Sequence, residues 1–79
     1  MQIEHKEDKV FLYMTDEEYT IMKYVQQYTG VMPETANFAA EAIDRVMFTS
    51  EIELDKDIAL NMIAQLRNLR YSKIEYKLL

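Results

Sequence analysis

The chain has 79 residues, which fits one domain spanning residues 1–79 with only a limited core. It has no cysteine, so disulfides cannot stabilise it, and we expect it to bury further surface in an oligomer. No apolar run approaches the roughly 20 residues that span a bilayer, and no secretory signal is recognisable. We therefore expect a cytoplasmic protein without a membrane partner.

Charge is distributed unevenly along the chain, whose formal net charge is −5. Residues 1–55 carry 4 basic and 12 acidic side chains, whereas residues 56–79 carry 5 basic and 2 acidic side chains. An acidic body repels a phosphate backbone at long range. Non-specific binding to nucleic acid is therefore disfavoured unless the cations gather on one face.

The N-terminal region predicts a short strand followed by a helix. Val10, Leu12 and Met14 recur with the two-residue period of a strand with one buried face. Thr15 then provides a helix cap, and three acidic residues follow it. Residues 2–5 could form a second short strand that folds back on residues 9–12 through a polar turn at residues 6–8.

Two further patterns predict the helices of the central region. Residues 16–28 carry one apolar face, and Gly30 suits the C-terminal cap of that helix. The second helix is predicted to open at Met32-Pro33 and to end at Thr49-Ser50. Its apolar stripe comprises Phe38, Ala39, Ala42, Ile43, Val46 and Met47.

The C-terminal region, residues 55–79, predicts a third helix and a tail. Asp55 is expected to cap this helix, whose apolar stripe comprises Ile58, Met62, Ile63, Leu66 and Leu69. Beyond Tyr71 an extended conformation sorts the side chains better than a helix does, with Ile74, Tyr76 and Leu78 on one side and Lys73, Glu75 and Lys77 on the other. Such a strand could pair with the N-terminal one, or the tail could fray or wrap a partner. The predicted fold class is mainly α with a short N-terminal strand, β-α-α-α, and a possible C-terminal strand.

Residues 9–47, a strand and two helices, resemble the ribbon-helix-helix family. The segment MTDEEYTIMK resembles that family's strand-to-helix junction, Gly30 matches its inter-helix turn, and residues 38–43 resemble its second helix. The resemblance implies a homodimer in which strands pair between subunits. Its shared core would include Val10, Leu12 and Met14, and Lys9, Phe11 and Tyr13 would face the DNA. The alternative is a small monomeric α+β domain.

The outward strand residues Phe11 and Tyr13 are unusual for reading duplex DNA, because base edges are mostly read by polar and basic side chains. Aromatic rings fit a protein contact better. They could also stack on unpaired bases, although the adjacent sequence offers few cations. A third interpretation is that they pack under the C-terminal segment.

No set of residues suggests catalysis. His5 is the sole histidine, there is no cysteine, and Ser50 and Ser72 have no obvious base, so we expect neither an enzyme nor a cofactor nor a small-molecule substrate. One stretch has alternating carboxylates but lacks the glycine and terminal glutamate of a calcium-binding hand, so no metal site is expected. Those carboxylates are Glu51, Glu53, Asp55 and Asp57.

Two functional classes remain. The first is a regulatory binding protein, a repressor or antitoxin that binds DNA, a partner protein or both. Arg67 and Arg70 lie off the apolar stripe of the third helix and are predicted to contact the partner, unless they neutralise nearby acidic residues, namely Glu51, Glu53 or Asp57. The second is a small acidic phage- or plasmid-type inhibitor, which would block a nucleic-acid-handling protein of a host or of a CRISPR-like defence system.

Overall fold

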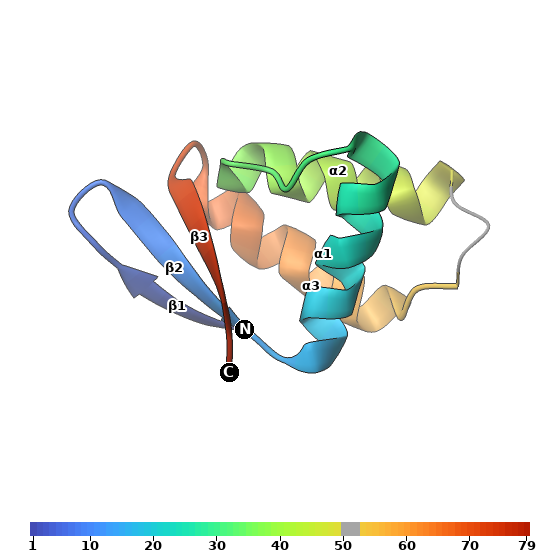
Figure 1. The fold of residues 1–79 in the computed structure, drawn as a ribbon, viewed down its shortest axis with the longest axis horizontal. Helices are drawn as coiled ribbons and strands as arrows, with labels where there is room; N and C mark the ends of the chain where they lie inside the picture. The colour runs from blue at the N-terminus through green and yellow to red at the C-terminus, as the bar shows by residue number, and fades with distance from the viewer. Residues whose placement is uncertain (50–52) are drawn as a thin grey trace.

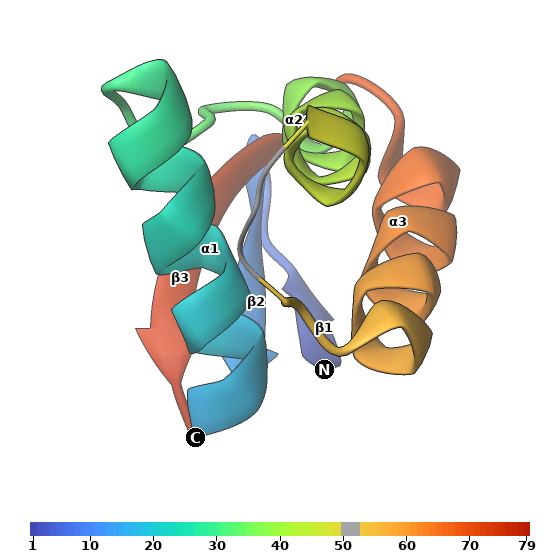
Figure 2. The same ribbon diagram turned by 90° about the vertical axis from the view of Figure 1, so that its right-hand side faces the viewer.

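A computed structural model describes residues 1–49 and 53–79 of the chain. In chain order its elements are β1 (Gln2–His5), β2 (Lys9–Met14), α1 (Asp16–Thr29), α2 (Ala36–Thr49), α3 (Lys56–Leu69) and β3 (Lys73–Leu78). The strands form one sheet in the order β1-β2-β3, with β1 antiparallel and β3 parallel to the central β2. The three helices lie on one side of this sheet (Figure 1) and stand in front of it after a quarter turn (Figure 2).

The predicted β-α-α-α fold class is wrong, because the elements follow the order β-β-α-α-α-β and build a three-stranded mixed sheet. The ribbon-helix-helix-like dimer in that prediction needs a strand with a free edge for a second copy. Both edges of β2 are occupied, by β1 and by β3 of the same chain. Val10, Leu12 and Met14, predicted to form a dimer interface, lie 0–2% exposed in the core of the single chain.

Helix boundaries follow the predicted caps where these are local. The Thr15 hydroxyl accepts a hydrogen bond from the Glu18 amide at 3.2 Å, and the Glu18 carboxylate accepts one from the Thr15 amide at 2.9 Å, which forms a capping box at the start of α1. Gly30 ends α1 with φ 87°, a left-handed conformation that glycine adopts without strain. Asp55 caps α3 by accepting from the Ile58 amide at 3.1 Å.

The start of α2 differs from its prediction, since the helix begins at Ala36 and not at Met32-Pro33. The preceding residues lie along the outer edge of β3 instead. The Ile74 amide donates to the Glu34 carbonyl at 2.9 Å, and the Tyr76 hydroxyl donates to the Pro33 carbonyl at 2.8 Å. Pairing with β3 therefore outweighs the preference of Pro33 for a first helical turn. The described part of α2 reaches Thr49, and the predicted end at Thr49-Ser50 involves Ser50, which lies outside the described residues.

The C-terminal residues form the strand that their alternation predicted, and it pairs with the N-terminal strand. Ile74 and Tyr76 pack against the core, while Lys73, Glu75 and Lys77 face the other way. The antiparallel β1-β2 hairpin is also present, with Ile3 opposite Leu12 and packed against the same core. Among the described residues, none of the helices has the length and apolar character needed to cross a membrane.

Replacing Tyr76 by phenylalanine tests how the α1–α2 loop is held to the sheet. Burial raises the pKa of the Tyr76 hydroxyl above its ordinary value near 10, so this group stays protonated and donates. Tyr76→Phe should lower the free energy of unfolding by about 1 kcal/mol, because the Pro33 carbonyl loses its donor. Urea unfolding would measure this loss. Tyr71→Phe, at a site 78% exposed, is the control, and equal midpoints for both variants would contradict the role given to Tyr76.

Candidate functional site: the open face of the sheet

The strand period that buries Val10 and Leu12 turns the intervening side chains of β2 away from the helices. These are Lys9, Phe11 and Tyr13, all half-buried. Register places Glu4 of β1 and Glu75 of β3 on either side of Phe11. With Lys6 from the hairpin turn, the side chains on this side of the sheet are Gln2, Glu4, Lys6, Lys9, Phe11, Tyr13, Lys73, Glu75 and Lys77, which we call the open face. All three described helices lie on the opposite side (Figure 2).

Two aromatic rings occupy the centre of the open face. The ring centroids of Phe11 and Tyr13 are 6.4 Å apart and nearly perpendicular, with an interplanar angle of 81°. The Nζ atoms of three lysines lie within cation–π range of the Phe11 centroid, at 5.6 Å for Lys6, 5.3 Å for Lys9 and 5.5 Å for Lys77. Three ammonium groups therefore lie close to the Phe11 ring.

Glutamates hold the lysines in place without neutralising them all. The Glu75 carboxylate lies 2.7 Å from the Nζ of Lys9 and 3.0 Å from that of Lys77, and Glu4 lies 2.8 Å from the Nζ of Lys6. Hydrogen bonds from Lys9 and Lys77 lower the pKa of Glu75, while its carboxylate raises the pKa of Lys9. Glu75 and Lys9 are therefore both charged at neutral pH. Exposed ion pairs contribute little to stability, so the lysines can exchange these partners for others.

The open face has a charge opposite to that of the remaining protein. It carries four lysines and two glutamates, whereas the other residues of the chain carry five basic and twelve acidic side chains. Two of those acidic residues, Glu7 and Asp8, lie in the hairpin turn at one end of the face. The basic character of the face is thus local.

The structure brings together three of the predicted binding residues, Lys9, Phe11 and Tyr13, on this face. The C-terminal segment does not cover the two rings, because β3 lies beside β2 in the same sheet. Sequence reasoning missed the contributions of Lys6, Lys73 and Lys77. The alternation of residues 73–78 could have indicated Lys73 and Lys77, but no local pattern predicts the parallel pairing that places Lys73 opposite Lys9 and Lys77 near Phe11.

Arg67 and Arg70, the other predicted binding residues, are exposed at the C-terminal end of α3 and do not belong to the open face. Ten residues of helix, about 15 Å, separate Arg67 from Asp57, which is too far for an ion pair. Glu53 precedes the helix at its far end, and Glu51 lies outside the described residues. Arg70 has φ 54° and ψ −118°, a conformation that favours glycine.

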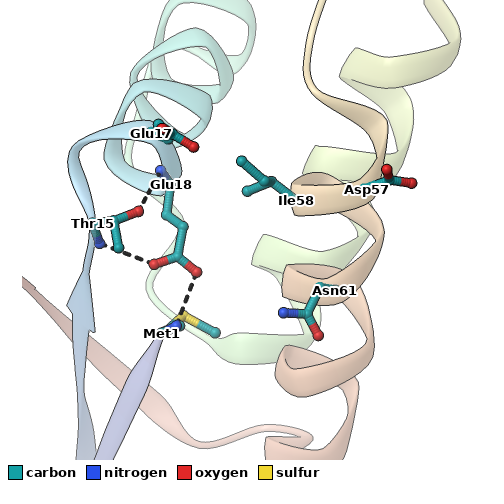
Figure 3. Close-up of a pocket in the computed structure, with 7 residues that line it drawn as sticks. All are labelled: Met1, Thr15, Glu17, Glu18, Asp57, Ile58 and Asn61. Atoms are coloured by element: carbon teal, nitrogen blue, oxygen red, sulfur yellow. Dashed lines mark hydrogen bonds and ion pairs between the residues drawn. The ribbon is translucent and has the colours of Figure 1, made fainter.

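A separate feature is a pocket between the first turns of α1 and α3 (Figure 3). Glu18 lies there, 5% exposed, and its carboxylate accepts from the Thr15 amide and pairs with the Met1 ammonium at 3.1 Å. These contacts give Glu18 a structural role at the start of α1. An adjoining pocket is lined by Glu17, Glu53 and Asp55, so acidic side chains from the starts of both helices gather at this end.

Metal-binding geometry is absent from the part of the chain that the structure describes, where no three His, Cys, Asp or Glu side chains could share an ion. His5 is exposed at the end of β1. Glu53, Asp55 and Asp57, from the alternating acidic stretch, flank the start of α3, where Asp55 acts as the cap.

Comparison of the chain with protein-family models, with curated proteins and with solved structures finds no match.

Replacing Arg70 by glycine tests whether the backbone at this position is strained. Its positive φ costs on the order of 1–3 kcal/mol in a non-glycine residue, and a glycine would relieve it at an entropic cost of roughly 0.5–1 kcal/mol. Arg70→Gly should therefore raise the free energy of unfolding by about 1 kcal/mol in urea. Arg67→Ala removes the same charge from a helical position and should change it little. A destabilised Arg70→Gly protein would show that no strain is stored there.

Proposed function

We propose that this is a non-enzymatic binding protein whose recognition surface is the open face. The observation that carries the proposal is the pair of aromatic rings at the centre of a sheet face, with three lysine ammonium groups near Phe11 and a fourth lysine on the same face of an otherwise acidic chain. Aromatic side chains dominate many binding surfaces because they bury a large area with few rotatable bonds. Their position on a central strand supports this use, since both neighbours hold that strand rigidly.

A regulatory role would then act through this face and not through a ribbon shared by two subunits. The face includes Lys9, Phe11 and Tyr13, the residues that the sequence singled out for contact with DNA or a partner protein. Arg67 and Arg70 remain predicted contacts at a second location. A repressor or antitoxin acting in this way would use one chain as the recognition unit.

A second candidate function is inhibition of a nucleic-acid-handling protein by the acidic end of the molecule. The observation that favours it is the gathering of Glu17, Glu53, Asp55 and Asp57 around the two pockets at the starts of α1 and α3. Such a group of carboxylates would attract a basic nucleic-acid channel. Helix capping and favourable interaction with the helix dipoles also account for acidic residues at these positions, so we rank this candidate second.

Affinity capture with three versions of the protein tests the proposal. The first is the wild type, and the second is the double variant Phe11→Thr/Tyr13→Thr, which removes both rings but keeps β-forming residues. The third is the control Phe48→Thr/Tyr71→Thr, which removes two rings that are 82% and 78% exposed away from the open face. Bound proteins and bound nucleic acid are both analysed.

We expect a partner that the wild type and the control retain and that the open-face variant loses. Circular dichroism and urea unfolding establish that all three versions are folded. Identical partners for all three would refute the open face as the recognition surface. If the shared partner is instead lost when Glu17, Glu53 and Asp57 are changed to glutamine, the acidic end is the binding site.

A further inference from the structure

We infer that the open face binds single-stranded nucleic acid, with two unpaired bases stacked on Phe11 and Tyr13. This inference rests on the proposed function and names the class of partner. The phosphates of the strand would be neutralised by the lysines around the rings, Lys6, Lys9, Lys73 and Lys77.

The two rings suit bases better than they suit a protein surface. None of the nine residues that define the open face is Ala, Val, Leu, Ile or Met, so apart from the lysine stems its apolar surface is that of the Phe11 and Tyr13 rings. Leu79, 64% exposed, follows only beyond the end of β3. The core of a protein interface is instead apolar and depleted of charged residues. Bases need only an aromatic surface to stack on, and sheets that present aromatic side chains on an exposed face bind two or three splayed bases in this way.

The lysines provide the charge that a phosphate backbone requires. Lys73 has no acidic partner among residues 1–49 and 53–79, and the other three pair only with Glu4, which is exposed, and Glu75, which is partly exposed. The ammonium groups of Lys6, Lys9 and Lys77 lie 5.3–5.6 Å from the Phe11 centroid. Their side chains are flexible, so each ammonium group can move from the ring to a phosphate when a base stacks there. Charge and stacking surface thus coincide on one face.

Sheet geometry disfavours duplex DNA as the partner. The major groove, about 12 Å wide, admits a helix or a two-stranded ribbon. The rings lie on the middle strand of three, with a neighbour about 4.8 Å away on each side, so β1 and β3 would meet the phosphate walls before the rings reached base edges. A single strand can lie across the face without this obstacle.

Fluorescence anisotropy with labelled dT12, rU12 and a 12-base-pair duplex provides the test. At 50 mM salt we expect both single strands to bind at least about ten-fold more tightly than the duplex. Four phosphate contacts predict a slope of up to about −2.8 for the logarithm of affinity against the logarithm of salt concentration. The relative affinity for dT12 and rU12 then shows whether DNA or RNA is preferred.

Variants separate stacking from charge. Phe11→Thr and Tyr13→Thr should each weaken binding by roughly five-fold or more, as expected for loss of one stacked base, while Tyr13→Phe should retain it. Lys9→Gln/Lys77→Gln should reduce the salt slope by about half, and the matched control Lys56→Gln, on α3, should leave it unchanged. Glu75→Gln should strengthen binding, because it removes a negative charge that holds two lysines.

Three results would overturn the inference. These are no binding at 50 mM salt with protein at hundreds of micromolar, equal affinity for the duplex, or unchanged affinity of folded Phe11→Thr and Tyr13→Thr variants. Amide chemical-shift changes in the wild type, expected along β2 and β3 and not along the helices, keep the test decisive if a variant fails to fold. If no oligonucleotide binds but a protein is captured in a Phe11- and Tyr13-dependent way, the proposed function stands and this inference fails.

Discussion

The pairing of β2 on both edges is the constraint on which the rest of the structure depends. Because β1 and β3 occupy its two edges, β2 lies at the centre of the sheet, and its alternate residues Val10, Leu12 and Met14 anchor the helical layer. Strand geometry then leaves Phe11 and Tyr13 only the opposite side. The same alternation that builds the core therefore produces the open face.

The open face also depends on the pairing of the C-terminal strand β3 with the N-terminal strand β2. The third strand follows about 60 residues after β2, and the loop before α2 holds its outer edge through Pro33 and Glu34. This pairing places Glu75 and Lys77 beside Phe11, although they are remote from it in sequence. It also concentrates positive charge on one face of an acidic chain, where long-range repulsion of phosphate would otherwise prevail.

The local structure of the helix ends could be predicted from the sequence, whereas the direction of pairing between strands distant in sequence could not. Thr15, Gly30 and Asp55 cap or end their helices as predicted, because capping depends on side chains within a few residues. The alternation of residues 73–78 predicted the strand, and pairing with the N-terminal strand was one of the alternatives, but its parallel direction was not predicted. The start of α2 at Met32-Pro33 was predicted wrongly, because the carbonyls of Pro33 and Glu34 accept hydrogen bonds from β3 and these residues are not helical. Lys9, Phe11 and Tyr13 were predicted to be binding residues from the sequence, whereas Lys6, Lys73 and Lys77 join them on one face only through the pairing of the three strands.

Amide hydrogen exchange followed by NMR tests the central position of β2 most directly. In a central strand successive amides bond alternately to the two neighbours, whereas in an edge strand every second amide is free. We predict that all the amides from Val10 to Met14 are strongly protected and that their exchange does not depend on protein concentration. Protection of alternate amides only, or protection that is lost on dilution as in a strand shared between two copies, would contradict this account of the fold and of its open face.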